Sequence, residues 1–300
     1  MAADRDPRRW FGPADLPAIE QEPTARGPLS SEAAELAQRG AITVEGLIPA
    51  ARCEAIVEAV RPHFERTGAE RLTNAAWALA PVRQLAADPA VLALLGRLYG
   101  RRAIPFQTLN FRYGTQQPLH RDTEHFDSLP PRFMCGVWVA LEDVREGQGP
   151  VSYVPGSHRG GTGDAVAFTA RQGDALIWAA ALEHGGALVT VPGSTRWSQV
   201  THYFFEDCVY CTPRRSDLAA GRLALRHPLV DLGTGRVVTP RFRGERARFR
   251  HGADGRSELL AEPGVALPGR AASAARGLWP QIHGRVRPVV ARVLGRPPRR

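Results

Sequence analysis

The chain has 300 residues, a hydrophobic fraction of 43% and a formal net charge of +9, which fits one large globular domain with a sizeable core. The sequence has no apolar run of about 18 residues, which excludes a membrane-spanning helix, and no apolar stretch follows its charged N-terminus, so we expect no secretory signal. Residues 241–300 hold 14 arginines and four acidic residues, so the remaining 240 residues are nearly neutral and lack the basic, aromatic face of a nucleic-acid-binding protein.

The N-terminal part predicts an arm followed by a strand and a helix. Residues 1–40 are rich in proline, glycine and charge and predict a partly disordered arm, with a short helical pattern from Ser31. Residues 41–48 predict a strand. A helix is expected to begin at Pro49, because apolar residues then recur at helical spacing; they are Ile56, Val57, Val60 and Phe64.

A second helix is expected where Asp88 can act as the N-cap and Pro89 as the first helical residue, with Gly100 near its end. After Gly100 the pattern changes to short apolar runs separated by glycine and proline, which is typical of an all-β sandwich or barrel. The expected strands are 104–111, 133–141, 151–154, 164–168, 175–179, 186–191 and 196–206. Preceded by helices, they predict a mainly β fold with flanking helices and a jelly-roll, cupin-like core.

The sequence divides into the arm, a body over residues 41–240 and an arginine-rich extension over 241–300. Within the extension, residues 282–294 follow a helical period, with Pro288 as a kink or a second start. Such a basic amphipathic helix could lie on an anionic membrane surface. The favoured interpretation is a terminal helix packed on its own domain or on a partner subunit.

His120 and Asp122 are the most informative pair in the chain. Side chains two residues apart on a strand point to the same side, so a strand over 119–123 would offer an imidazole and a carboxylate to one metal ion while Arg121 turns away. His184, from a distant strand, would complete a face of two histidines and one carboxylate, the arrangement typical of non-haem Fe(II).

Arg196 and Ser198 follow twelve residues later and would share one side of a strand. A guanidinium holds a carboxylate through two parallel hydrogen bonds and keeps its charge. The pair therefore suits a dicarboxylate co-substrate. Either residue alone could equally be structural; the ordered combination with the metal motif favours function.

The motifs resemble, over about residues 40–213, the phytanoyl-CoA dioxygenase family of Fe(II)/2-oxoglutarate oxygenases. They are Gln117-x-x-His120-Arg-Asp122, Val137-Trp-Val-Ala-Leu-Glu-Asp143, Gly149-Pro150, Val154-Pro-Gly-Ser-His158, Gly173-Asp174-Ala, Glu183-His184-Gly185 and Arg196-x-Ser198.

The resemblance implies a double-stranded β-helix in which His120, Asp122 and His184 bind iron. It implies that Arg196, assisted by Ser198, holds the distal carboxylate of 2-oxoglutarate. By the same resemblance, Gln107 and Asn110 are candidates for contact with the co-substrate. O2 would be the second co-substrate, and 2-oxoglutarate would be decarboxylated to succinate as an unactivated C–H bond is hydroxylated.

Several further residues have two interpretations. His125, Phe126 and Trp138 are substrate candidates, although His125 could be a solvated loop residue and Trp138 a core residue. His158 is expected to stabilise its loop rather than to bind metal. One interpretation places His202, which is in phase with Arg196, facing the barrel interior, and the favoured one is a buried, hydrogen-bonded imidazole.

The four cysteines are few and lie in expected helices and strands, as is typical of reduced thiols in a cytoplasmic enzyme. Cys208 and Cys211 have zinc-like spacing but no second pair of ligands. His-Arg-Asp also begins the catalytic loop of protein kinases, but position 127 is Asp where that loop needs Asn, and the chain has no lysine. Two alternatives remain: a non-catalytic cupin-like binding module and a zinc-dependent hydrolase. The substrate, small or carrier-bound, is not encoded in any motif.

Overall fold

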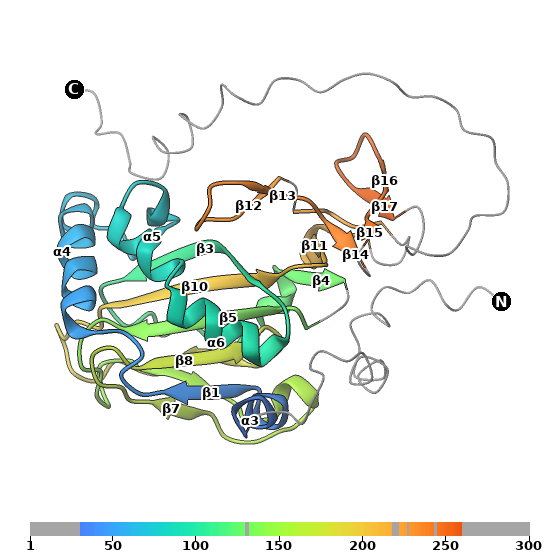
Figure 1. The fold of residues 1–300 in the computed structure, drawn as a ribbon. Helices are drawn as coiled ribbons and strands as arrows, with labels where there is room; N and C mark the ends of the chain where they lie inside the picture. Colours follow the sequence, from blue (N-terminus) through green and yellow to red (C-terminus); the bar gives the residue numbers. More distant parts are fainter. Residues whose placement is uncertain (1–30, 130–131, 218–221, 227, 243–244, 260–300) are drawn as a thin grey trace, which may run out of the picture.

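The computed structural model describes residues 31–129, 132–217, 222–226, 228–242 and 245–259. Two antiparallel sheets form its centre (Figure 1). The larger sheet has the strand order β1 (Ala41–Val44), β8 (Ala175–Ala179), β5 (Met134–Ala140), β10 (Ser198–Phe205), β3 (Ala103–Phe111) and β2 (Arg71–Thr73). The smaller sheet has the order β7 (Val166–Phe168), β6 (Val151–Tyr153) and β9 (His184–Gly186).

Strand β5 is buried along its whole length because both faces of the larger sheet are covered. Val137 and Val139 belong to the core on the helical side, whereas Trp138 and Ala140 belong to a second core, which includes Val151 of the smaller sheet. Alternate residues of one strand therefore fill two separate hydrophobic layers. The expected mainly β, jelly-roll fold is confirmed.

Three helices cover the outer face of the larger sheet (Figure 1): α4 (Ala50–Thr67), α5 (Ala80–Ala86) and α6 (Pro89–Tyr99). Helix α6 begins as expected, since Asp88 Oδ1 accepts hydrogen bonds from the backbone N–H groups of Ala90 and Val91 at 2.8 and 3.1 Å. It ends at Gly100, whose φ of 66° is the left-handed conformation that glycine adopts without strain.

Some elements differ from the expected ones. Strand β1 ends at Val44 rather than at residue 48. The expected strand 186–191 is wrong: β9 ends at Gly186, and beyond it only Val189 makes an isolated bridge, to Gln148. The apolar residues there suggested a strand, but Leu188 is 72% exposed and this segment has no continuous partner strand.

Short elements of the body were not expected from the sequence. They are β2, α5, β4 (Asp127–Leu129) and β11 (Val209–Cys211). Strands β4 and β11 pair with each other at one end of the larger sheet (Figure 1). They have only three residues each, which is too short for a periodic pattern to be recognised.

Residues at both ends of the body pack onto it. Helix α3 (Ser31–Arg39) buries Ala33 and Leu36, so these residues form part of the folded unit rather than of a loose arm. After β11 the chain forms three small hairpins, the first beside the start of β3 and the other two near β4 and β11 (Figure 1). They pair β12 (Leu229–Val230) with β13 (Val237–Val238), β14 (Arg241–Phe242) with β15 (Glu245–Arg246), and β16 (Phe249–His251) with β17 (Ser257–Leu259).

The possible amphipathic helix at 282–294 lies outside the described residues. Within the described ranges, no helix combines the length and the apolar character that crossing a membrane requires.

Candidate metal and 2-oxoglutarate site

His120, Asp122 and His184 meet where the loop after β3 lies beside β9. One potential ligand atom from each lies within 4.8 Å of the others. His120 and His184 are joined by two backbone hydrogen bonds, of 2.9 and 3.0 Å. The expected strand over 119–123 is wrong, because Asp122 begins a 3-10 helix, Asp122–Glu124. The bridge to β9 and this turn bring the ligands together instead of strand alternation.

The two imidazoles are oriented by backbone carbonyls. His120 Nδ1 lies 3.0 Å from Pro118 O, and His184 Nδ1 lies 2.9 Å from Leu182 O. A carbonyl oxygen can only accept a hydrogen bond, so each Nδ1 carries the proton and each Nε2 offers a lone pair. Burial also lowers the pKa of His184, which favours the neutral imidazole that a metal requires.

The Asp122 carboxylate is buried and held by several polar groups. Trp178 Nε1 donates a hydrogen bond to Asp122 Oδ2 at 2.9 Å, and His202 Nε2 lies 3.5 Å from the same oxygen. Burial alone would raise the pKa of Asp122, but His184, His202 and Trp178 hold it well below its usual range. Asp122 therefore remains ionised, as a metal ligand must.

Gly136 makes room for the Trp178 ring. The two residues are partners in the β5–β8 register, and a Cβ at Gly136 would lie 2.2 Å from the ring. Glycine at this position allows the indole to approach β5 and to reach Asp122.

Arg121 turns away from the metal ligands, as expected. Its Nη2 donates to Glu183 Oε1 at 3.0 Å and to Ser157 O at 3.3 Å. The bond to Glu183 connects the loop that carries His120 and Asp122 to the residue directly before His184.

Arg196 is buried just before β10. Its Nη1 donates to Gly149 O at 3.1 Å, while its Nε has no hydrogen-bond partner. Ser198 Oγ and Trp138 Nε1 are also buried without a partner, and the Arg196 guanidinium lies 5.9 Å from the centre of the Trp138 ring. Burial lowers the pKa of Arg196 to about 10, which still leaves it charged near neutral pH. Unsatisfied buried donors beside a buried cation suit a carboxylate.

Gln107 and Asn110 lie on opposite faces of β3. Gln107 lines the same cavity as the metal ligands, and its Oε1 is hydrogen-bonded to His202 Nδ1 at 2.9 Å. Asn110 instead donates to Gln199 Oε1 at 3.2 Å, and Gln199 donates to Val82 O on the helical side. Because side chains alternate along a strand, Asn110 cannot share the face of Gln107. We therefore drop Asn110 as a co-substrate contact.

A cavity of about 600 Å³ connects these groups. The three metal ligands and Arg196 line it, as do the three substrate candidates His125, Phe126 and Trp138. His202 faces the cavity and is hydrogen-bonded, so both interpretations of that residue hold.

The structure also places His158 and the two closely spaced cysteines. His158 Nε2 lies 3.0 Å from Ala37 O, which connects the loop to helix α3. Cys208 and Cys211 are buried and form no disulfide, and among the described residues His120, Asp122 and His184 form the one cluster suited to a metal ion.

Several cavity residues were missed. Gln117, whose amide lies 3.3 Å from His120 Nε2, belonged to a recognised motif and could have been proposed. Arg71, Arg215 and Arg226 also line the cavity, but no motif marks them.

Comparison with known proteins agrees with this geometry. The family model described as phytanoyl-CoA dioxygenase matches residues 36–187. The chain belongs to the phytanoyl-CoA dioxygenase family. The expected family is thus confirmed, and its match ends before Arg196.

The proteins similar to this chain match different shares of its length. A probable phytanoyl-CoA dioxygenase from Caenorhabditis elegans is 33% identical over 51 residues, 17% of this chain and only 16% of that protein. The epimerase SnoN of nogalamycin biosynthesis has a TM-score of 0.54 and 22% identity, covering 61% of this chain and 84% of its own. EctD from S. alaskensis, solved with 2-oxoglutarate and 5-hydroxyectoine, has a TM-score of 0.52 and 19% identity, covering 62% and 81%. These structures support the fold.

Proposed function

We propose that this chain is an Fe(II)- and 2-oxoglutarate-dependent dioxygenase that hydroxylates an unactivated C–H bond of a small or carrier-bound organic substrate. One observation carries the proposal: a cluster of two histidines and one aspartate shares a cavity with a buried arginine that no carboxylate of the described residues neutralises. The first group suits Fe(II) with open coordination positions, and the second suits the far carboxylate of 2-oxoglutarate.

The donor set fits the metal. His120 and His184 would bind through Nε2, since their Nδ1 protons are engaged by backbone carbonyls. Asp122 would bind as an ionised carboxylate, with Trp178 and His202 fixing its orientation. When bound, Fe(II) and 2-oxoglutarate supply the activation of O2, with 2-oxoglutarate decarboxylated to succinate.

The protein's own residues bind, orient and exclude water. Arg196 and Trp138 line one end of the cavity, and each has a buried donor atom without a partner; the buried Ser198 hydroxyl, in phase with Arg196 on the chain, is also without one. A carboxylate there would satisfy them, which avoids the cost of leaving buried donors unpaired. Phe126 and Trp178 supply apolar walls near the metal ligands, where a substrate carbon would lie.

The test is anaerobic titration of the purified chain with Fe(II) and 2-oxoglutarate. The expected result is the weak visible absorption band of an iron–2-oxoglutarate chelate, which His120→Ala abolishes. His63→Ala, a histidine on the outer helix α4, is the matched control and should retain the band. With O2, succinate formation should then increase in the presence of a substrate.

Two results would contradict the proposal. Tight zinc binding with ester hydrolysis and no response to 2-oxoglutarate would favour the hydrolase. A folded protein that binds neither iron nor 2-oxoglutarate would favour the non-catalytic binding module.

A further inference from the structure

The cavity has a second basic wall, away from Arg196. Arg215 and Arg226 line it, while Asp122 is the single acidic residue among the lining residues that the structure describes. Arg215 is exposed, and Arg226 is half-buried. Two arginines thus lie on a part of the cavity that the proposed function has not used.

Arg226 lies against the aromatic side of the metal site. Its guanidinium is 4.5 Å from the centre of the Phe126 ring and 5.3 Å from that of Phe106. The Phe126 ring is in turn 5.3 Å from the ring of His202, which lies beside Asp122. The rings of Phe126 and His202 therefore lie between Arg226 and the metal ligand Asp122.

Arg226 and Arg196 lie toward opposite ends of β10. Arg196 lies two residues before the strand, whereas His202, near Arg226, is six residues farther along, or about 20 Å at the usual rise. The metal ligand Asp122 contacts the strand at His202. A molecule held by Arg226 would approach the metal from the side that Arg196 does not occupy.

Among the residues that the structure describes, no acidic side chain pairs with Arg226. Burial and the neighbouring charge of Arg215 together lower the pKa of Arg226 to about 10, and the Cys211 thiol opposes them. A half-buried cation without a carboxylate partner in the described part of the chain is costly unless a ligand supplies the anion. Its flat guanidinium suits a carboxylate or a phosphate.

Charge balance in the loaded site leads to the same conclusion. The dianion of 2-oxoglutarate and the Asp122 carboxylate balance the charges of Fe(II) and Arg196. Arg215 and Arg226 then remain positive around the space left for substrate. A neutral substrate would leave these charges uncompensated.

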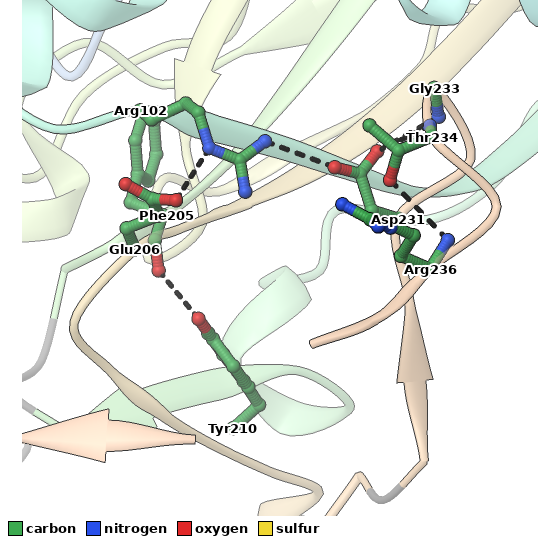
Figure 2. Close-up of polar contacts among 8 residues, drawn as sticks. All are labelled: Arg102, Phe205, Glu206, Tyr210, Asp231, Gly233, Thr234 and Arg236. Carbon is green, nitrogen blue, oxygen red and sulfur yellow. Dashed lines mark hydrogen bonds and ion pairs between the residues drawn. The ribbon is translucent and has the colours of Figure 1, made fainter. Parts of the chain in front are cut away.

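The segment that carries Arg226 is fixed to the core by side-chain contacts (Figure 2). Arg102 donates to Glu206 Oε1 at 2.5 Å and to the buried Asp231 at 3.0 Å. Asp231 also accepts from the backbone N–H groups of Gly233 and Thr234 at 2.8 and 3.3 Å. On the other side of Arg226, the Tyr210 hydroxyl donates to Phe205 O at 2.8 Å.

The backbone N–H of Arg226 itself donates to Tyr210 O at 2.9 Å. Anchors on both sides thus hold Arg226 at a defined place in the wall, which a specific contact with substrate requires.

We propose that the substrate carries an anionic group, a carboxylate or a phosphate, and that Arg226 binds this group while the carbon to be oxidised lies near the metal. The inference rests on the proposed function and adds a substrate class to it. Arg215, at the exposed part of the same wall, attracts the anion. Phe126 and Trp178 contact the apolar part of the molecule.

The test is calorimetric titration of the whole chain, loaded anaerobically with Fe(II) and 2-oxoglutarate, with three matched probes: phenylacetate, phenylacetamide and phenyl phosphate. The wild type should bind an anionic probe about tenfold to a hundredfold more tightly than the neutral amide. Arg226→Gln should remove this preference, and Arg226→Lys should keep part of it. Arg214→Gln, an exposed arginine of the same segment outside the cavity lining, should match the wild type.

The probes also separate the sources of the anion. Preference for phenylacetate points to a free carboxylic acid, and preference for phenyl phosphate to a phosphorylated or carrier-linked substrate. Equal binding of all three probes, binding of no anionic probe, or a preference that Arg226→Gln retains would overturn the inference.

The visible band of the iron–2-oxoglutarate chelate is recorded in the same samples. Its absence in the wild type would instead contradict the proposed function. Should Arg226→Gln not fold, the wild type decides by itself, because its preference for anions must then decrease as salt concentration rises.

Discussion

The two ends of the cavity both present an arginine without an acidic partner in the described chain, but they are built differently. At one end, Arg196 is only 3% exposed and lies two residues before a central strand of the larger sheet. At the other end, Arg226 is half-buried on a segment that follows the last strand of that sheet and is fixed by side-chain contacts. The first end therefore suits a co-substrate that does not vary. At the second end, the residues that bind the ligand can change without altering the sheets.

The metal ligands lie between the two ends, so their loss should have the largest effect. His184→Ala removes one of three ligands, and we expect iron binding and succinate formation to fall below detection. Trp178→Phe keeps an aromatic ring but removes the indole N–H that donates to Asp122. It should weaken iron binding about tenfold to a hundredfold. Equilibrium titration with Fe(II) measures both, and iron binding of wild-type strength in His184→Ala would invalidate the assigned site.

The next effect separates the co-substrate end from the substrate end. Arg196→Ala should weaken 2-oxoglutarate by roughly one to two powers of ten, because a charged hydrogen-bonding group is lost. Arg196→Lys should restore only part of the affinity for 2-oxoglutarate, since lysine cannot form two parallel hydrogen bonds with a carboxylate. Iron affinity should not change, and Arg214→Ala serves as the control. If 2-oxoglutarate binds Arg196→Ala with unchanged affinity, another residue holds the carboxylate.

Asp127 tests the stability of the β4–β11 pair, from which the Arg226 segment begins. Burial raises the pKa of Asp127 from 3.8 to about 8, so between these values the folded state keeps a proton that the unfolded state has lost. The contribution of Asp127 to stability is therefore complete below about pH 4 and declines toward pH 8, by up to about 1.4 kcal/mol per pH unit.

Asp127→Asn removes this titration. As pH rises from 5 to 8, the free energy of unfolding of the variant should increase relative to that of the wild type. Above pH 8 the difference between the two should become constant. Urea unfolding across pH 5 to 9 measures this, with the exposed Asp164→Asn as control. Parallel pH curves for wild type and Asp127→Asn would show that Asp127 is ionised in the fold.

The smallest expected effect concerns the anchor of the substrate end. Arg102→Ala removes the contacts to Glu206 and Asp231, but Arg102 is half-exposed, so we expect a loss of about 1 kcal/mol or less in stability. Amide exchange should increase over residues 228–238, and the preference for anionic probes should decrease. Affinity for 2-oxoglutarate should not change; an equal loss at both ends would mean that they are not independent.

The site could be predicted from the sequence only in part. The metal ligands and Arg196 were identifiable because their motifs occur in a fixed order. The motifs did not reveal how the ligands meet: a bridge to β9 and a 3-10 turn bring them together, not strand alternation. The role of Asn110 was taken from the family resemblance alone. In the structure, β3 directs Asn110 to the face opposite that of Gln107, so it is no longer a candidate.

Local sequence patterns determined the longer helices, the strands of the larger sheet other than β2, and the cap at Asp88, since each depends on residues close together in the chain. The tertiary structure decided the rest. The apolar residues near 186–191 remained a loop for lack of a partner strand, and three-residue strands formed where distant segments met. Arg226 became part of the cavity because Arg102 and Asp231, 129 residues apart, hold its segment in place. Such contacts join residues whose separation leaves no periodic signal in the sequence.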